Sequence, residues 1–511
     1  MNARDIILGS GPSGVAAAKA LTARGRDVLV LDAGLEMDAS AKALRDRMGA
    51  AEPDAWSDED REAIGAVRRS EKSDSIQPFG SDFLFRLPEE MAEYGDPQSV
   101  HALRPSFAKG GLSNGWGASV LPYHERDFDG WPITLDDLRP HYQAIAQMIG
   151  MSGQKDGLAS LYSGIGMDDA QPLPASRQAR ELLARMDRKK QALGQLGVHY
   201  GASRQAIAPG CRACAMCLYG CPYRLIFNAG YEIERMAADD ILRYQGSAIA
   251  TGFSEHATGV TVHSNQGEFQ AERLFVATGV LPTARLVLSS LGLDAHEVTI
   301  LDSQHFYLPM LHSWSAGDPA VEPRHTLAQA FWEINDPAVE DHVVHAQLYT
   351  YNDTYAPDMR QRFGPFAGIA KPLIEAMSRR LIVAQPFLHS DVSPAIGARL
   401  DGGKLAYRRI DNDRTAAAMD RVKNRLAQVA RMAGMLPLTP LMRPGSLGSS
   451  FHCGGSFPMR DTPGTGETDM LGRPAGLKHT HIVDASIFPT VPAPTITFSV
   501  MANAHRIASA A

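Results

Sequence analysis

The sequence lacks the marks of several classes of protein. No apolar run approaches the length of a helix that spans a bilayer. No basic tract occurs either, and 57 acidic residues outnumber 50 basic ones to give a formal charge of −7, so we expect no nucleic-acid partner. The first residues, "MNARDIILGSGPSG", read as a strand at once and leave no room for a signal peptide. These absences predict a cytoplasmic protein and leave open only a peripheral association with a membrane.

Cysteine is also scarce, and its distribution is uneven. Four of the five cysteines lie within the stretch "GCRACAMCLYGCPY" at 210–223. In a reducing compartment, cysteines spaced this closely are more often metal or redox ligands than disulfide partners. The stretch is therefore a candidate site for a metal ion or a cluster.

Residues 5–34 carry the pattern of a nucleotide-binding β-α-β unit. Buried-strand patterns at 5–8 and 27–34 flank the turn "GSGPSG" and an Ala-rich helix. Gly9 permits the tight turn, Gly11 lets a pyrophosphate approach the backbone, and Gly14 lets the helix pack closely on the strand. Asp32, at the end of the second strand, is placed to bind a ribose hydroxyl pair.

Three segments of the chain resemble the glucose–methanol–choline (GMC) flavoprotein oxidoreductases. They are "GSGPSG", "FAKGGLSNGWGASV" at 107–120, and the block at 449–508 that runs from "SSFHCGGSFPM" to "PTITFSVMANAHRIA". The middle segment looks like the family's Gly-Gly-x-Ser loop, which lies against the flavin, and all three stand in the family's order. The resemblance implies an α/β fold (α+β overall), with a Rossmann-like FAD-binding domain of the GMC type and a second substrate domain built on an antiparallel sheet plus helices.

At 511 residues the chain is too long for one simple core, which agrees with two domains. Strand patterns of the nucleotide-binding kind return at 267–290 and 481–490, so we expect the FAD-binding domain to be discontinuous. We assign to it residues 1–36, 100–135, 205–300 and 445–511, with the cysteine-rich loop at 210–223. The substrate or cap domain and its insertions take 37–99, 136–204 and 301–444, of which 37–99 read as a solvated insertion.

The resemblance implies FAD as the cofactor. Some relatives tether the flavin to a histidine of the 107–120 loop, but no histidine lies between His101 and His124, so we expect non-covalent FAD. By resemblance, Asp484 lies near the ribityl or pyrophosphate part. Thr495 begins a helix whose N-terminal amides could face the electron-rich edge of the flavin. The loop residues expected to line the flavin are Gly110, Gly111, Ser113, Asn114, Trp116 and Gly117.

His452, in "FHCGG", matches the family's catalytic histidine, which takes the hydroxyl proton while the hydride goes to flavin N5. A neutral imidazole suits a base near neutral pH. One position departs from the family pattern. The family normally carries a second His or Asn where this chain has Ala493, and alanine has no hydrogen-bonding side chain. His305, Tyr307 and His389 are candidates for that role without a supporting motif, and a structural role is the alternative for each.

Cys211, Cys214, Cys217 and Cys221 spell C-x2-C-x2-C-x3-C-P, the run of bacterial ferredoxins. Soft thiolates suit iron, whereas a zinc knuckle usually draws two CxxC pairs from separate loops. The stretch also resembles the C-x5-C-x3-C-P segment of the catalytic subunits of bacterial FAD-dependent glucose and sugar-alcohol dehydrogenases, in which it holds a three-iron cluster. Cys214 is additional, so [3Fe–4S] and [4Fe–4S] clusters both stay open. Cys453 as a further ligand and structural thiols without a cluster also stay open.

Together these features predict an FAD-dependent dehydrogenase that oxidises a hydroxyl group of a sugar-like or polyol substrate. Its electrons would pass through the iron–sulfur cluster to an external acceptor, either an electron-acceptor protein or a quinone. Three alternatives stay open: an oxidase, a redox-neutral sugar epimerase or isomerase, and a redox carrier that turns over no substrate.

Overall fold

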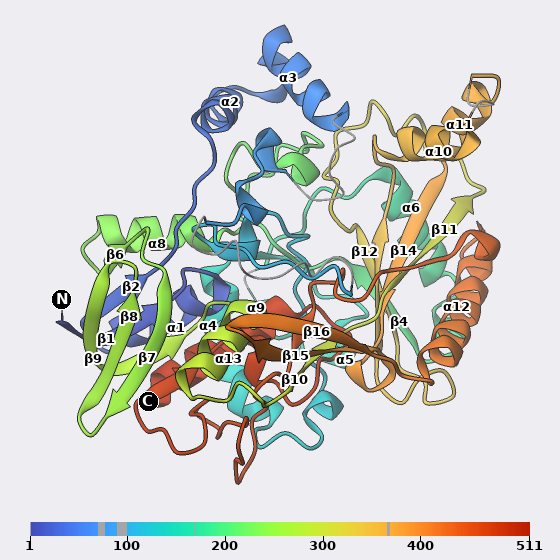
Figure 1. Ribbon diagram of the computed structural model, residues 1–511. Coiled ribbons are helices and arrows are strands. Elements are labelled where there is room, and N and C mark those ends of the chain that lie inside the picture. Colours follow the sequence, from blue (N-terminus) through green and yellow to red (C-terminus); the bar gives the residue numbers. More distant parts are fainter. Residues whose placement is uncertain (1, 70–76, 89–99, 169, 365–367) are drawn as a thin grey trace.

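Two seven-stranded sheets form the frame of the protein, as Figure 1 shows for the computed structural model. The structure describes residues 2–69, 77–88, 100–168, 170–364 and 368–511, so parts of the predicted insertion at 37–99 lie outside the described residues. The first sheet draws on both ends of the chain, and the second is built mainly from its middle. A four-stranded sheet lies between them in this view.

The first sheet has the parallel centre of a nucleotide-binding fold. β1 pairs in parallel with β2 and β9, and β20 extends β9 in the same sense. The "VLVL" of β2 is buried at every position, as expected for a parallel strand covered on both faces. The strands run in the order β6 (Arg243–Gln245), β2 (Val28–Leu31), β1 (Asn2–Leu8), β9 (Gly267–Val276), β8 (Gly259–Ser264) and β7 (Ala250–His256), with β20 (Thr480–Ile482) beside β9.

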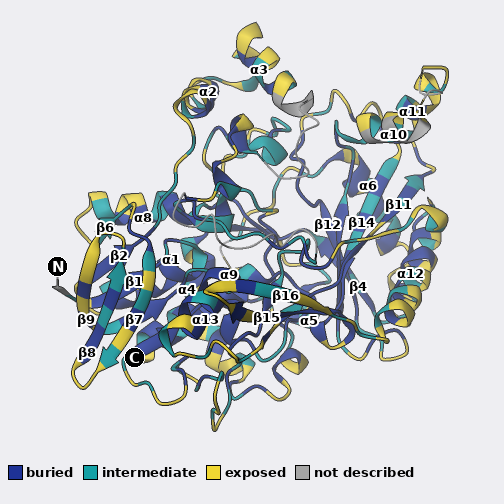
Figure 2. Ribbon diagram, in the orientation of Figure 1, coloured by how far each residue is buried: buried dark blue, intermediate teal, exposed yellow. Residues whose placement is uncertain are grey.

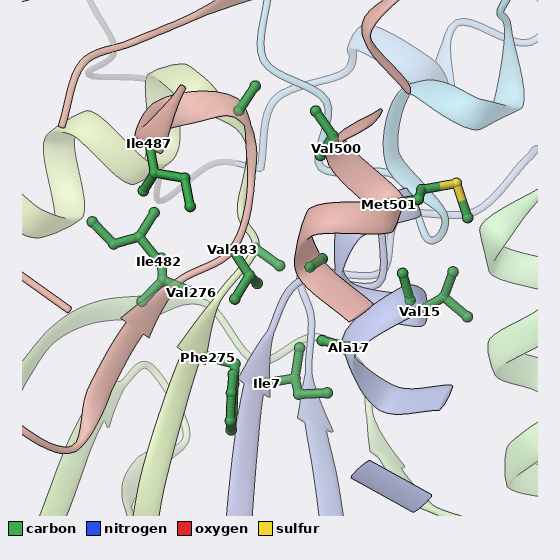
Figure 3. Packing of buried hydrophobic residues seen from close by; sticks show 14 of the residues in the cluster. Ile7, Val15, Ala17, Phe275, Val276, Ile482, Val483, Ile487, Val500 and Met501 are labelled. Atoms are coloured by element: carbon green, nitrogen blue, oxygen red, sulfur yellow. The ribbon is translucent and has the colours of Figure 1, made fainter. Parts of the chain in front are cut away.

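Contact between α1 (Pro12–Ala23) and α13 (Ile496–Ala510) closes the core over this sheet. Both helices are rich in alanine on their buried sides, which lets their backbones approach closely. Figure 3 shows Val15 of α1 and Met501 of α13 in one cluster with Ile7 and Phe275 of the sheet. The N-terminal and C-terminal segments are thus held together by one apolar core.

The second seven-stranded sheet is antiparallel, and its two faces differ. An apolar cluster covers one face and includes Ala330, Trp332 and Ile334 of β12. It also contains residues of the helices α6 (Arg177–Asp187) and α12 (Thr415–Met432). Because side chains alternate along a strand, Phe331 and Glu333 project from the opposite face, which is called the polar face below. The strands run in the order β17 (Met435–Pro437), β11 (Phe306–His312), β14 (Leu381–Phe387), β13 (Val344–Tyr349), β12 (Ala330–Ile334) and β4 (Val198–Ala202), with β18 (Arg443–Pro444) beside β11.

Residues 136–148 and 395–410 pack with the nucleotide-binding core, although the sequence analysis assigned them to the second domain. Helix α4 (Leu135–Met148) packs on α13, and its buried Leu138 and Tyr142 join the first core. The apolar face of α4 is visible in the sequence, but the partner that covers it is not. The four-stranded sheet joins the same core; its order is β16 (Lys404–Ile410), β15 (Ala395–Asp401), β10 (Val298–Asp302) and β19 (Cys453–Gly454).

The remaining helices lie around these sheets, and Figure 2 shows many exposed residues on the outlying α3, α11 and α12. Among the described residues, no helix combines the length and the apolar character needed to cross a bilayer. A short pair, β3 (Met151–Ser152) and β5 (Gln205–Ala206), completes the strands. The other helices are α2 (Ala39–Gly49), α3 (Asp58–Arg69), α5 (Ala159–Tyr162), α6 (Arg177–Asp187), α7 (Lys190–Gly194), α8 (Ala229–Ala238), α9 (Val280–Ser290), α10 (Tyr355–Phe363), α11 (Lys371–Ser378) and α12 (Thr415–Met432).

A buried carboxylate ties β1 to β9 and to the segment before β2. Asp5 of β1 is fully buried and binds Arg26 at 2.7 Å and Arg273 at 2.8 Å. Asp5→Ala leaves both guanidinium groups without this partner, so we expect the free energy of unfolding to fall by about 3 kcal/mol. Asp27→Ala is the control, because its pair with Arg243 is exposed and should contribute less than about 1 kcal/mol. Equal effects of the two changes in urea unfolding would contradict this account.

Candidate active site

The glycine-rich turn lines a cavity together with segments from both ends of the chain. Gly9 has a φ of +96°, and an added Cβ on Gly14 would lie 2.1 Å from the carbonyl oxygen of Gly9. Gly11, in contrast, has open space beside its Cα, as a backbone that receives a ligand requires. The same cavity is lined by residues that the sequence assigned to the cofactor, among them Asp32, Gly111 and Asp484.

Asp32 is placed at this cavity by two hydroxyl groups. The hydroxyl of Ser10 donates to Oδ2 of Asp32, and the hydroxyl of Tyr244 donates to the same oxygen at 3.1 Å. Burial raises the pKa of Asp32 to about 6, and the two hydroxyl donors oppose this rise. A buried carboxylate with remaining acceptor capacity is suited to a pair of ribose hydroxyls.

Asp484 and the start of α13 form another wall of the cavity. Oδ2 of Asp484 accepts hydrogen bonds from the backbone of Gly279 at 2.9 Å and from the hydroxyl of Thr283 at 2.5 Å. Asp484 therefore fixes the loop before α9, and burial raises its pKa. Thr495 is the N-cap residue of α13, as predicted, and its buried hydroxyl has no protein partner. Such an orphaned group at a helix N-terminus is suited to a ligand.

The loop at 110–117 lies between this cavity and a larger one. Gly111 lines the first cavity, whereas Ser113, Asn114, Trp116 and Gly117 line the second. The loop is held from behind: the Ser113 hydroxyl accepts from the backbone of Ala229 at 2.9 Å, and the Trp116 indole donates to the carbonyl of Phe227 at 3.0 Å. Gly110, at φ +87°, donates its N–H to the Ser10 hydroxyl at 2.8 Å. A cofactor that contacts this loop can therefore reach both cavities.

Gly11→Ala and Gly14→Ala form a matched pair of tests for this cavity. We expect Gly14→Ala to lower the unfolding temperature of the apoprotein, because the new Cβ meets the Gly9 carbonyl. Gly11→Ala adds a Cβ with no protein atom within 4 Å, so we expect an unchanged apoprotein. Its FAD affinity should nevertheless fall by about tenfold or more, or about 1.4 kcal/mol. Thermal melts and FAD titration of the apoprotein measure both effects, and full FAD affinity in Gly11→Ala would contradict the assignment.

The larger cavity has a volume of about 1150 Å³. This exceeds the roughly 300–1,000 Å³ of common small-molecule pockets, so it has room for more than one molecule. Its walls bring together the 113–117 loop, the polar face of the second sheet, and part of the cysteine-rich loop. The lining residues with hydrogen-bonding groups or aromatic rings include Asn114, Trp116, Arg224, His305, Tyr307, Tyr349, Asn352, Tyr355, Gln385 and Arg443.

His452 lies in the loop between the two cavities, whose walls include its neighbours Ser449, Phe451 and Cys453. Asp302 shapes this loop by accepting from the backbone of Gly448 at 2.7 Å and the hydroxyl of Ser450 at 2.5 Å. The imidazole of His452 stacks on Phe387 with ring centroids 4.6 Å apart, and its buried Nδ1 has no hydrogen-bond partner.

The surroundings of His452 keep its imidazole uncharged. Burial lowers the pKa of His452 to about 3, and the nearby imidazoles of His345 and His305 contribute to the shift. The group is therefore neutral at pH 7 and has a lone pair to accept a proton. This is the state that a general base requires.

His345, which sequence reasoning missed, lies beside His452. Its Nδ1 is 2.7 Å from Oε1 of Glu333, both side chains are fully buried, and the hydroxyl of Tyr162 donates to the other Glu333 oxygen at 2.8 Å. Nε2 of His345 is buried without a partner. The alternation in "VVHAQLYTY" places His345 on the same face as Tyr349, which lines the large cavity. That period-2 pattern was the signal that could have identified it.

The three candidate substitutes for the residue missing at position 493 occupy different places. Ala493 itself is fully buried. His305 and Tyr307 line the large cavity, and burial lowers the pKa of His305 to about 4. His389 is 1% exposed and does not line this cavity. His305 and Tyr307 therefore remain candidates for substrate contact, and His389 does not.

The thiols of the cysteine-rich loop lie close enough to affect one another's ionisation. Cys214 is close enough to Cys211, Cys217 and Cys221 for their charges to affect its pKa, which burial raises to about 12. Burial likewise raises the pKa of Cys217 to about 11. Hydrogen bonds with backbone groups oppose this rise in three thiols. The backbone groups belong to Ala213 for Cys211, to Met216 for Cys214 and to Thr326 for Cys217. Hydrogen bonds to sulfur are a regular feature of iron–sulfur sites.

The cysteine-rich loop has left-handed backbone positions, and its four sulfurs are spread apart. Ala213 and Ala215 have φ values of +50° and +59°, and such left-handed residues shape loops that bind anionic groups. All four cysteines are free. Within the described ranges, Asp127, His342 and His389 form the one group of three ligand atoms within 4.8 Å of one another, so the four sulfurs are too far apart to share one ion. A cluster needs wider spacing, because its irons lie between the sulfurs.

The fifth cysteine stands apart. Cys453 is buried in the first core, its thiol donates to Asp302 at 3.5 Å, and it lines the cavity of the glycine-rich turn. Cys217 and Cys221 line the larger cavity. The alternative in which Cys453 joins the other four as a ligand therefore has no support from this arrangement.

The insertion predicted to be solvated covers the cysteine-rich loop. Met48 of α2, Ile64 of α3 and Phe79 pack with Met216 in a small apolar cluster, which Cys214 also contacts. A side chain on Gly220 would meet the ring of Phe79 at 2.5 Å. The charged surface of these helices hides this short apolar face from a reading of the sequence.

Comparisons with known proteins agree with this geometry. Residues 404–504 match the family described as GMC oxidoreductase, in its C-terminal domain, and residues 7–37 match an NAD(P)-binding Rossmann-like domain. Pyridoxine 4-oxidase from Mesorbium loti has a similar fold, with a TM-score of 0.61 and 15% identity over 99% of this chain and 98% of its own. No curated protein sequence matches the chain. The protein is an oxidoreductase that acts on CH–OH groups.

The matched C-terminal range contains His452, Asp484, Ala493 and Thr495, so the site residues predicted there lie in a GMC oxidoreductase domain. The predicted fold class, with a Rossmann-like domain and an antiparallel sheet plus helices, is confirmed. The cysteine-rich loop at 210–223 lies outside both matched ranges. Neither match therefore indicates what the cysteine-rich loop binds.

Proposed function

We propose that this oxidoreductase is an FAD-dependent dehydrogenase that oxidises a hydroxyl group of a sugar-like or polyol substrate and delivers the electrons through an iron–sulfur cluster to an external acceptor. The large cavity is the observation that carries this proposal. Its wall includes Trp116 of the 110–117 loop, His305 and Gln385 of the second domain, and Cys217 and Cys221. Substrate oxidation and electron exit would thus share one cavity.

The residues around the first cavity fit FAD. Gly11 would admit the pyrophosphate and Asp32 would bind ribose hydroxyls, because both residues line this cavity. FAD, when bound, accepts a hydride from the carbon that carries the hydroxyl group. The protein's own part is to hold the substrate carbon and to remove the hydroxyl proton.

His452 is the residue that would take this proton. Its pKa of about 3 leaves the imidazole neutral, and stacking on Phe387 holds the orientation of the ring. The imidazole would become protonated from solvent only at low pH, because burial shifts its pKa downward. We therefore expect the base to be competent over the whole neutral range.

His345 would supply the second imidazole that position 493 lacks. Both His345 and His452 lie against Phe387, with ring centroids 6.0 Å and 4.6 Å from it. Glu333 holds Nδ1 of His345 and leaves Nε2 as the free position. This is the arrangement by which a buried carboxylate orients an imidazole in catalytic sites. His345 is thus a positioning residue for the base and for the substrate oxygen.

Two substitutions test these roles. We expect His452→Ala to lower the rate of anaerobic flavin reduction by substrate about 10²–10⁴-fold, because general base catalysis contributes about this much. Glu333→Gln should lower the rate less, by about tenfold, and change the pH profile, because the His345 imidazole loses its orienting charge. Wild type should keep a constant rate from about pH 8 to about pH 5, since the neutral form of a base with a lowered pKa persists to acid pH.

His256→Ala, at an exposed histidine of β7 in the first sheet, is the control and should leave the rate unchanged. Stopped-flow absorbance of the flavin gives the rate at each pH. A His452→Ala variant that is reduced at the wild-type rate would contradict the assignment and favour the carrier alternative.

The lining of the cavity favours a substrate with many hydroxyl groups. Amide, phenol, imidazole and guanidinium groups of Gln385, Asn352, Tyr307, His305 and Arg443 offer donors and acceptors, and the aromatic residues offer flat apolar faces. A sugar ring presents both kinds of surface. An aromatic alcohol is the competing class, because the fold is similar to that of a pyridoxine oxidase.

The alternative functions separate by their acceptors. An oxidase would consume oxygen with each turnover. A redox-neutral epimerase or isomerase would need no acceptor and would exchange the configuration of one carbon. The proposed dehydrogenase would reduce an artificial acceptor with little oxygen uptake, and its natural acceptor would be a protein or a quinone, the latter reached by peripheral association with a membrane.

The cysteine-rich loop fits an iron–sulfur cluster held by Cys211, Cys214, Cys217 and Cys221, which would be [4Fe–4S], or [3Fe–4S] if one thiol stays free. Such a cluster supplies one-electron transfer. The protein's part is to bury the thiols beneath Phe79 and Met48 and to donate backbone hydrogen bonds to the sulfurs. Without a metal, burial raises the pKa values of Cys211, Cys214 and Cys217, so these thiols are costly to keep anionic.

Cys217→Ser and Cys453→Ser test the cluster as a matched pair. We expect wild-type protein purified without oxygen to hold roughly three or four irons per chain and to give a cluster EPR signal. Cys217→Ser should lose most of this iron and the reduction of external acceptors, yet substrate should still bleach its flavin. Cys453→Ser should keep the iron, because its thiol lies beside Asp302. Absence of iron after anaerobic reconstitution would overturn the cluster and move the oxidase forward.

A further inference from the structure

Charge is distributed unevenly in the wall of the large cavity. Among the described residues that line it there is no aspartate or glutamate, although acidic residues outnumber basic ones in the chain as a whole. Of the same lining residues, Arg224 and Arg443 carry a permanent positive charge. Guanidinium groups in a wall without carboxylates attract anions. The charge of the wall therefore bears on which substrate the cavity accepts.

The two arginines differ in whether their charge is already balanced. Arg224 lies 3.0 Å from the carboxylate of Asp46, and its guanidinium lies over the ring of Tyr231 at 5.1 Å from the centroid. Arg443 is exposed, and neither an ion pair nor a hydrogen bond joins its side chain to another residue that the structure describes. Its N–H donors are therefore available to a ligand, and one positive charge of the wall is unbalanced.

Arg443 is held beside the polar face of the second sheet. β18 pairs antiparallel with β11, and Arg443 lies directly opposite Tyr307. Opposite residues of such a pair project to the same side, and both side chains line the cavity. The backbone N–H of Gly445 donates to the carbonyl of His305 at 2.8 Å, and the amide of Gln304 donates to the carbonyl of Gly445 at 3.0 Å. These bonds fix the segment that carries Arg443 against β11.

A row of rings leads from Arg443 to the proposed base. The ring centroid of His305 lies 5.3 Å from that of Tyr307. It lies 5.6 Å from that of Phe387, on which His452 stacks. Tyr307 is 41% exposed, whereas His305 is 2% exposed, so Arg443 and Tyr307 lie on the solvent side of the row. A substrate can thus present a hydroxyl group to the buried end and a charged group to the outer end.

We propose that Arg443 binds a carboxylate of the substrate, so that the sugar-like or polyol substrate is a sugar acid. A guanidinium group can form two parallel hydrogen bonds with one carboxylate. The hydroxyl of Tyr307 accepts from the amide of Gln385 at 3.4 Å, which leaves its own hydrogen to donate to the same group. The inference rests on the proposed function for the reacting hydroxyl group, whereas binding of the anion does not depend on turnover.

The number of charges favours a carboxylate over a phosphate. A phosphate monoester carries a charge of about −1.5 to −2 at pH 7. Arg443 supplies one unbalanced positive charge, since Asp46 already balances Arg224. Burial lowers the pKa of His305 to about 4, so its imidazole adds no charge at pH 7. A carboxylate has a single negative charge and matches Arg443 alone.

Three compounds that differ only at carbon 6 test the inference: glucose, glucuronate and glucose 6-phosphate. Their affinities are measured by calorimetry with holoenzyme whose flavin has been reduced without oxygen, so that no turnover contributes. We expect glucuronate to bind about tenfold or more tightly than glucose, because hydrogen bonds to a charged group have effects of this size. Added salt should weaken the binding of glucuronate and leave that of glucose unchanged.

Variants of Arg443 separate binding of the carboxylate from a general effect on the cavity. Arg443→Gln should lose the preference for glucuronate and keep the affinity for glucose. Arg443→Lys should keep part of the preference, because lysine retains the charge but not the two parallel donors. With an artificial acceptor, Arg443→Gln should raise KM for glucuronate about tenfold at nearly unchanged kcat, since the contact is equal in the ground and transition states. Arg409→Gln, at an exposed arginine of β16, is the control and should match wild type.

The possible results lead to different conclusions. Equal affinity of wild type for glucose and glucuronate would overturn the inference, and so would a preference for glucuronate that survives in Arg443→Gln. Tightest binding of glucose 6-phosphate would overturn the assignment of a carboxylate. Glucuronate that binds through Arg443 but bleaches no flavin would support the carboxylate site and contradict the proposed function, so the two failures are distinguishable.

Discussion

Burial of the polar face of the second sheet is the constraint on which the active site depends. Its other face is sealed by α6 and α12, so the residues of the polar face must find partners inside the protein or in a ligand. Glu333 and His345 form a hydrogen bond with each other, whereas Nε2 of His345 and Nδ1 of His452 have no hydrogen-bond partner. The same burial lowers the pKa of His452. A site built this way keeps the imidazole of His452 neutral.

Burial also shifts the pKa values of the thiols in the cysteine-rich loop, but it raises them, whereas it lowers that of His452. Burial disfavours thiolates, and the nearby thiols disfavour one another's ionisation, yet backbone hydrogen bonds are aimed at the sulfurs. Hydrogen bonds to sulfur stabilise an anionic group and gain little from a neutral thiol. The backbone of the loop is therefore arranged to stabilise sulfur in its anionic form. The cover formed by Met48, Ile64 and Phe79 shields part of the loop from solvent.

The sequence predicted those parts of the protein whose chemistry is local. The turn at Gly9–Gly14, the acid at Asp32 and the helix that begins after Thr495 are local patterns, and the structure brings them to one cavity. His345 depends on a pairing between β12 and β13 that no local pattern states. The partner of α4 and the cover of the cysteine loop were missed for the same reason, because an amphipathic helix shows that it has a buried face but not which surface buries it.

The departure at Ala493 acquires a physical meaning from this arrangement. The segment before α13 is fully buried there, so a larger polar side chain would have to displace neighbours or bring its own partner. In the proposed function the second imidazole would come instead from His345 of β13, for which Glu333 of β12 already provides that partner. A histidine placed on a central strand is fixed by ladder hydrogen bonds on both sides, with β12 and with β14. A catalytic group moved from a loop to the middle of a sheet gains rigidity, and its position then depends on how firmly the sheet is held against the nucleotide-binding domain.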